Sequence, residues 1–209
     1  MTATQRDVEI AAAKTEILER AVKAIRSYAE VKTAKKKWQE ADALIRDADV
    51  IFGCVDGYNQ RKQLERAARR FLIPYIDIGM DVHALDNANF AISGQVILSL
   101  PGEWCMTCMG FLTDAKLQTE ARRYGDAGVN PQVVWSNGSL ASAAIGLFVQ
   151  MVTPWSEKRA RYAYLEYNGN DHTLRHSRLP EKLAPARCPH FDNSDDIGDP
   201  YFQIARPRP

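Results

Sequence analysis

The fold is decided at residues 50–57, which read Val-Ile-Phe-Gly-Cys-Val-Asp-Gly. An unbroken apolar run that ends in Asp56-Gly57 is typical of a strand covered on both faces, as in a parallel sheet. Residues 59–71 follow with helical spacing and an arginine-rich face that we expect to point outward, and a second buried strand is expected at 75–79. This strand–helix–strand order predicts an α/β fold with a doubly wound sheet and a right-handed crossover.

Further elements are expected on both sides of this unit, from periodicity and from turn residues. They are a helix at 6–28, a strand at 29–35, a helix at 38–46, a strand at 92–100, a surface helix or crossover segment at 113–124, a long apolar helix capped by Ser136 or Asn137 and ending near Val152, and a terminal hairpin with strands at 162–167 and 173–179. We expect a first domain at 1–155 and, at 156–209, the hairpin and a tail that pack on it.

The composition favours a protein of the reducing cytoplasm without a nucleic-acid or membrane partner. The chain has 209 residues, a net charge of +1, and a charged N-terminus unlike a secretory signal. No charged residue occurs between Asp126 and Glu157, but Asn130, Pro131 and several serines interrupt this stretch, which predicts a helix buried in the core rather than a bilayer span. Four cysteines without a signal sequence are expected to be free, metal-bound or catalytic.

Asp56 is the first candidate for chemistry. In open α/β sheets, ligands bind beyond the carboxyl ends of the strands, and Asp56 stands where the strand at 50–55 ends. A carboxylate there either holds Mg²⁺ against the phosphates of a nucleotide or simply makes a turn with Gly57. The residues alone favour neither reading.

Several segments together resemble the HesA/MoeB/ThiF family, which includes the adenylating halves of ubiquitin-activating enzymes. They keep the family's order over residues 6–152. The segments are Ala13-Lys14-Thr15-Glu16, Ala48 to Gly57 followed by Arg61, Ile73 to Gly79, Asp126-Ala127-Gly128-Val129, and Gly138-Ser139-Leu140-Ala141.

The resemblance implies a reaction and roles for three residues. ATP activates the C-terminal carboxylate of a ubiquitin-like β-grasp carrier protein, which gives an acyl-adenylate and pyrophosphate. By resemblance, Lys14 contacts phosphate, Asp56 holds Mg²⁺, and Arg61 supports either one. Arg61 has an alternative reading as an ordinary surface arginine of its helix.

The sequence departs from the family pattern at its start. The family's glycine-rich loop precedes the segment that Lys14 matches, whereas the thirteen residues before Lys14 contain no glycine. We therefore expect an incomplete Rossmann-like sheet that binds ATP weakly or not at all by itself. Either a separate polypeptide supplies the complementing N-terminal half, or the sequence is a truncated or wrongly started product, or it is a degenerate relative of the family. The alternative is a non-catalytic ThiF-like interaction module, and a dinucleotide-binding oxidoreductase is a weaker third. A homodimer is also expected from the family, but neither the carrier protein nor its pathway is identified.

Cys105 and Cys108 have the spacing with which two thiolates reach one tetrahedral Zn²⁺. The family has a second cysteine pair near its C-terminus, where this chain has Cys188 followed by Pro189-His190. We expect Cys105, Cys108, Cys188 and His190 to bind structural zinc in loops. His172 and His176 are alternatives for the fourth ligand, and an oxidisable thiol pair without metal is the alternative for the site.

Two further expectations concern thiols. Some family members form a covalent link through a cysteine just before the segment that matches 127–129, where this chain has Tyr124-Gly125-Asp126. We therefore expect adenylation without covalent transfer to this chain. Cys54 lies in an apolar run and is expected to be a buried core thiol.

Overall fold

The computed structural model describes residues 3–85, 89–122, 133–156 and 160–191. The chain divides into two compact units, Met1–Asp47 and Ala48–Pro209. The C-terminal hairpin hydrogen-bonds into the sheet of the second unit. The expected boundary between residues 155 and 156 stays a prediction. The expected tail at 192–209 and the segments at 124–126 and 126–129 lie outside the described residues.

The first unit is helical, with α1 (Gln5–Glu9), α2 (Lys14–Ile25), the 3₁₀ helix η1 (Trp38–Glu40) and α3 (Asp42–Arg46). The single helix expected at 6–28 is interrupted, since Ala11 takes the left-handed conformation (φ 49°) and Glu16 caps a new helix by accepting from the Ala13 N–H. Arg20 on α2 pairs with Asp7 on α1 at 2.6 Å. Residues 29–35 form no strand, so that expectation was wrong.

The second unit is built on a mixed, open five-stranded sheet in the order β1-β2-β3-β4-β5. Its strands are β1 (Ile51–Gly53), β2 (Tyr75–Ala84), β3 (Phe90–Ser99), β4 (Ala163–Asn168) and β5 (Thr173–His176). β1 and β2 are parallel, and every later pairing is antiparallel. The α/β class and the parallel strand–helix–strand unit are thereby confirmed, and so is the hairpin.

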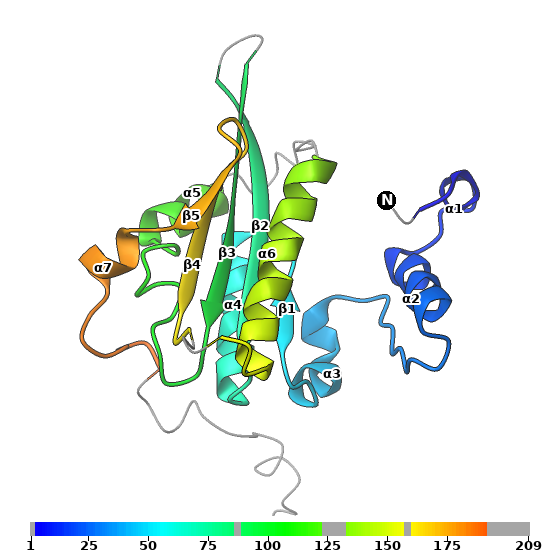
Figure 1. Ribbon diagram of the computed structural model, residues 1–209, viewed down its shortest axis with the longest axis horizontal. Coiled ribbons are helices and arrows are strands. Elements are labelled where there is room, and N and C mark those ends of the chain that lie inside the picture. Colours follow the sequence, from blue (N-terminus) through cyan, green and yellow to red (C-terminus); the bar gives the residue numbers. More distant parts are fainter. Residues whose placement is uncertain (1–2, 86–88, 123–132, 157–159, 192–209) are drawn as a thin grey trace, which may run out of the picture. The chain divides into compact units, whose positions relative to one another are not determined.

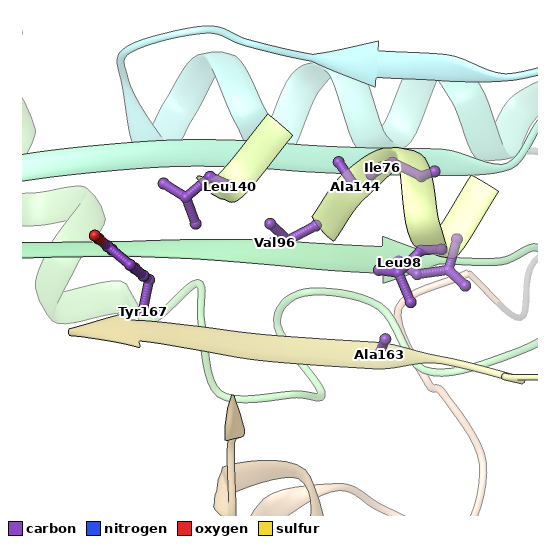
Figure 2. Close-up of a cluster of buried hydrophobic side chains, with 8 residues drawn as sticks. Ile76, Val96, Leu98, Leu140, Ala144, Ala163 and Tyr167 are labelled. Carbon is purple, nitrogen blue, oxygen red and sulfur yellow. The ribbon is translucent and has the colours of Figure 1, made fainter. Parts of the chain in front are cut away.

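Helix α6 (Val134–Val152) packs on one face of the sheet (Figure 1). Its Leu140, Ala144 and Leu147 recur at helical spacing and meet Ile76 and Val96, as Figure 2 shows for the labelled residues. The opposite side of the helix is exposed, including Trp135. The helix expected in the core is therefore buried on one face only. The expected cap was wrong, because Ser136 lies inside the helix and contacts Tyr167. In the described part of the chain, no helix is long and apolar enough to cross a bilayer.

Helix α4 (Tyr58–Arg70) connects the parallel strands and packs beside β1 and β2, with α5 (Asp114–Arg122) next to it (Figure 1). The arginine-rich face expected to point outward is only partly outward. Three charged residues at four-residue spacing are buried, namely Arg61, Glu65 and Arg69. Each has a polar partner in the sheet, which is Asp77 of β2 for Arg61 and Ser99 of β3 for the other two. The short helix α7 (Leu179–Leu183) follows the hairpin.

Candidate active site and metal centre

A cavity of about 560 Å³ opens beyond the carboxyl end of β1, where an open α/β sheet binds its ligands. It is lined by residues that follow β1, by the first turn of α4, by the middle of β2 and of β3, by Phe111 before α5, and by one face of α6. The lining residues are Cys54, Val55, Asp56, Tyr58, Arg61, Ile78, Gly79, Met80, Asp81, Gln95, Phe111, Asn137 and Ala141.

Asp56 lies in the wall of this cavity, and its side chain is exposed. Strand β1 ends at Gly53, so the backbone has left the sheet before it reaches Cys54 and Asp56. The same early end exposes Cys54, which corrects the expectation of a buried core thiol. Partial burial nevertheless raises the pKa of the Cys54 thiol, which keeps it protonated near neutral pH.

Arg61 lines the cavity from α4, but a buried carboxylate already neutralises its charge. Its Nη1 donates to Asp77 Oδ2 at 2.6 Å and to the Ile78 carbonyl at 3.1 Å. Asp77 is fully buried and also accepts from the Tyr75 hydroxyl at 2.8 Å and from Gln95 Nε2 at 3.1 Å. Arg61 is thus a buried anchor of the cavity wall, and the alternative reading as a surface arginine was wrong.

The turn after Asp56 is fixed by α5. Both oxygens of Glu120 accept at 2.8 Å, one from the Tyr58 N–H and the other from the Asn59 N–H, at the start of α4. A Cβ on Gly57 would lie 2.5 Å from Glu120 Oε1, so a larger residue here would displace the Glu120 carboxylate. A carboxylate at this end also suits the helix dipole.

An aromatic pair forms another part of the wall. The rings of Tyr58 and Phe111 lie 5.8 Å apart, and Lys116 Nζ lies 5.3 Å from the first ring and 4.7 Å from the second. Lys116 also donates to the Phe111 carbonyl at 2.8 Å. Burial lowers the pKa of Lys116 and raises that of Tyr58, since each charged form is poorly solvated there.

The structure brings Cys105, Cys108, Cys188 and His190 together, with all four ligand atoms within 4.8 Å of one another. Cys105 Sγ lies 3.6 Å from Cys108 Sγ, and His190 Nδ1 lies 3.4 Å from the first sulfur, 3.3 Å from the second and 4.0 Å from Cys188 Sγ. Zinc–ligand bonds of about 2.0–2.3 Å in a tetrahedron place ligand atoms roughly 3.5–3.8 Å apart. The spacing of this cluster therefore fits one tetrahedral metal ion.

The three thiols lie close enough to shift one another's pKa values. Cys188 accepts hydrogen bonds from Cys105 and Cys108, and the bond from Cys105 contributes most to lowering the pKa of Cys188 to about 4. The same bond raises the pKa of Cys105, and burial raises that of Cys108. A divalent ion bound by the three sulfurs would displace the protons that they carry.

Comparison with known proteins defines the family. The sequence matches the ThiF family over residues 1–189. The chain belongs to the ThiF family. Among proteins of curated function, none matches its sequence.

Solved structures agree on the ThiF-type fold. The E. coli enzyme MccB with ATP has a TM-score of 0.64 at 14% identity, over 90% of this chain and 53% of that one. PaaA has a TM-score of 0.54 at 15% identity, over 79% and 55%. The microcin C7 biosynthetic enzyme MccB with N-formylated MccA has a TM-score of 0.58 at 13% identity, over 86% and 51%. The chain therefore spans about half the length of these structures.

Among the residues that the ThiF resemblance singled out, Asp56 and Arg61 share one cavity. Lys14 begins α2 in the first unit, whereas Asp56 belongs to the second, so their contact with one nucleotide stays a prediction. His172 and His176 lie at the β4–β5 hairpin, outside the cysteine cluster.

Sequence reasoning missed Asp77 and its partner Gln95, together with Glu65 and Arg69 on α4. A signal for Asp77 was present, because a lone carboxylate between Ile76 and Ile78 in a buried strand requires a cationic or hydrogen-bonding partner.

Proposed function

We propose that this ThiF-family chain provides the Asp56 wall of a site in which ATP adenylates the C-terminal carboxylate of a ubiquitin-like β-grasp protein. A carboxylate oxygen of the carrier attacks the α-phosphorus of ATP, the bond to the leaving phosphate breaks, and pyrophosphate departs. The observation that carries the proposal is the exposed Asp56 carboxylate in a cavity of about 560 Å³ at the end of β1, in a chain that matches the family over residues 1–189.

The charges of the cavity favour a cation at Asp56. Asp56 and Asp81 both line it, whereas the charge of Arg61 is paired with Asp77 behind the wall. A triphosphate and a carboxylate entering this cavity would be repelled unless a further positive charge came with them. Mg²⁺ prefers carboxylate and phosphate oxygens, and bound at Asp56 it would neutralise the phosphates. Lys14 is proposed to contact the same phosphates.

The residues of the protein would position the carboxylate of the carrier and the α-phosphorus of ATP. Glu120 fixes the turn that carries Asp56, and the buried Arg61–Asp77 pair fixes the adjacent wall. Reacting atoms held in line lower the barrier without any covalent contribution from the protein. Consistent with this mechanism, we propose that the carrier protein never becomes bonded to a cysteine of this chain.

The cysteine cluster is proposed to hold a structural Zn²⁺. Three sulfurs and one imidazole nitrogen complete a tetrahedron, so the site has no open position for substrate, and closed sites of this kind are structural. The expected homodimer stays a prediction.

ATP–pyrophosphate exchange tests the proposal. The full chain would be assayed with Mg²⁺ and β-grasp proteins encoded beside its gene, with and without a neighbouring segment that carries a strand and a glycine-rich turn. We expect exchange when both pieces are present and a loss of at least about 100-fold in Asp56→Asn.

Asp114→Asn serves as the matched control, because Asp114 is an exposed aspartate in the first turn of α5 and does not line the cavity. Exchange that persists in Asp56→Asn would show that Asp56 is not the metal ligand. A β-grasp protein that binds tightly while no combination gives exchange would replace the proposal with the interaction module.

A further inference from the structure

Helix α4 reaches from the cavity to the cysteine cluster. Its first turn contributes Tyr58 and Arg61 to the cavity wall. One and two steps of four residues further along, Glu65 and Arg69 are 1% and 3% exposed and pair with each other at 3.8 Å. Two buried charges on a surface helix need a reason, because burying them is unfavourable unless all their hydrogen bonds are satisfied.

Arg69 holds the backbone that leads into Cys105. Its Nη1 donates to the Glu103 carbonyl at 3.1 Å, and its Nη2 donates to the Trp104 carbonyl at 2.9 Å. Nε and Nη2 also donate to Ser99 Oγ, at 3.1 and 2.8 Å. The planar guanidinium thereby spans the end of β3 and the two residues before the first cysteine, which a lysine ammonium cannot reproduce.

Glu65 holds the residue on the other side of Cys105. Its Oε1 accepts the Met106 N–H at 2.9 Å and the Ser99 hydroxyl at 2.5 Å. Together the two side chains fix residues 103–106, the half of the cysteine loop that carries the first ligand. The second half closes on itself, because the Cys108 N–H donates to Cys105 Sγ at 3.4 Å.

The loop that carries Cys188 and His190 meets the same structure. Arg69 lies 4.8 Å from the centre of the Phe191 ring, next to His190. Trp104 Nε1 donates to the Pro185 carbonyl at 2.7 Å, three residues before Cys188. Arg69 thus contacts both ligand-bearing loops, although neither it nor Glu65 offers a ligand atom to the cluster.

We propose that Glu65 and Arg69 are positioning residues that hold both loops in the metal-binding arrangement, so that the ion does not have to organise them. The proposal rests on the metal site of the proposed function. The outer partners that orient metal ligands typically change metal affinity about 10- to 100-fold when they are removed.

The test is a Co²⁺ and Zn²⁺ titration of the full chain, followed by the thiolate–Co²⁺ absorption and by competition with a chromogenic chelator. We expect Arg69→Met to bind both ions about 10- to 100-fold more weakly. Arg69→Lys is expected to bind both ions as weakly as Arg69→Met does, because lysine restores the charge without the planar set of N–H donors of the guanidinium. Arg66→Met, which truncates an exposed arginine on the same helix, is the control and should bind like the unaltered chain.

Arg69→Met leaves Glu65 buried without its cation, so a second variant protects the test against misfolding. The double variant Glu65→Gln/Arg69→Met removes both charges at similar volume, and circular dichroism would confirm its fold. A purely structural role predicts equal destabilisation of metal-free and metal-loaded protein with unchanged affinity and an unchanged Co²⁺ spectrum. A positioning role predicts a larger loss in the loaded form, by linkage.

Three outcomes separate the proposals. Weaker metal binding in a folded double variant supports the positioning role. Unchanged metal binding in both Arg69→Met and the double variant overturns it and leaves the metal site standing. Failure of the unaltered, reduced chain to bind either ion overturns the metal site and the positioning role together, while the test of Asp56 is unaffected.

Discussion

The cavity and the cysteine cluster lie at opposite ends of α4, and they define their chemistry in different ways. The cluster is closed, because four ligand atoms from two distant loops converge within 4.8 Å. The cavity is open, and the carboxylates of Asp56 and Asp81 line it. The donor set of the cluster fits a tetrahedral soft metal by itself, whereas the chemistry of the cavity depends on what enters it.

The two regions also use buried charge differently. At the cavity, Arg61 and Asp77 neutralise each other inside the wall, so that Asp56 keeps its charge for a ligand. At the cluster, Glu65 accepts from the Met106 N–H and Arg69 donates to the Glu103 carbonyl, so both charges bind backbone groups of the cysteine loop. One helix therefore supports both regions, through side chains that a polar sequence pattern would place in solvent.

The largest effect on stability is expected from breaking the cluster. Cys108→Ser removes one of the three sulfurs, so the chain should lose the proposed metal and at least about 4 kcal/mol of stability, as losses of structural metals do. For a chain of this size that corresponds to a fall of about 8–16 °C in Tm. Metal analysis and a thermal melt under reducing conditions measure both quantities.

Cys54→Ser is the matched control, because Cys54 is an exposed thiol at the cavity and outside the cluster. It should keep the metal and the Tm of the unaltered chain. Equal melting temperatures for the two serine variants, with equal metal content, would remove the distinction between a structural cluster and a ligand-binding cavity.

A smaller effect is expected from the buried pair at the cavity. Arg61→Met leaves Asp77 fully buried without its cation, which typically costs about 3–5 kcal/mol. A urea titration measures the loss, and Asp77→Asn in the same chain should recover much of it because the orphan charge disappears.

Lys62→Met, at the exposed neighbouring position, should stay within about 0.5 kcal/mol. If Arg61→Met is equally mild, Arg61 does not anchor the wall and is available to a ligand instead. That result would make the cavity less acidic than its contacts indicate, and it would weaken the argument for a cation at Asp56.

Local patterns predicted most of the second unit. The apolar run at 50–55, the helix after it and the strand at 75–79 appear as β1, α4 and β2. Local apolar periodicity predicts such elements when the same face of a strand or helix is buried along its length. The prediction failed where tertiary contacts override that pattern. Cys54 is exposed because β1 ends early, and the helix expected at 6–28 is broken at Ala11.

The part of the candidate site that lies in short sequence motifs could be predicted. Cys105 and Cys108 follow from spacing, and Cys188 with His190 came from the family resemblance and from adjacency. Glu65 and Arg69 were not predictable, since their partners at 99–106 lie about thirty or more positions away in sequence. A charged helical residue reads as exposed until its buried acceptors are known.

The smallest change in stability is expected when either of two glycines is replaced by alanine. A Cβ at Gly79, in the cavity wall, would overlap Gln95 Nε2 and lie 2.6 Å from Arg61 Nη2, whereas a Cβ at Gly138, in α6, would meet nothing within 4 Å. Gly79→Ala should therefore cost about 1–3 kcal/mol by displacing the groups that hold Asp77. Gly138→Ala should instead stabilise the chain by up to about 1 kcal/mol, through helix propensity.

Urea unfolding of both alanine variants measures this difference, and its sign matters more than its size. Opposite signs would show that Gly79 is required by the close approach of Arg61 and Gln95 to the sheet, so that the cavity wall is packed as tightly as a core. Two stabilising substitutions would mean that the wall yields to a methyl group, and the Arg61–Asp77 pair could not then be a rigid anchor of the wall beside Asp56.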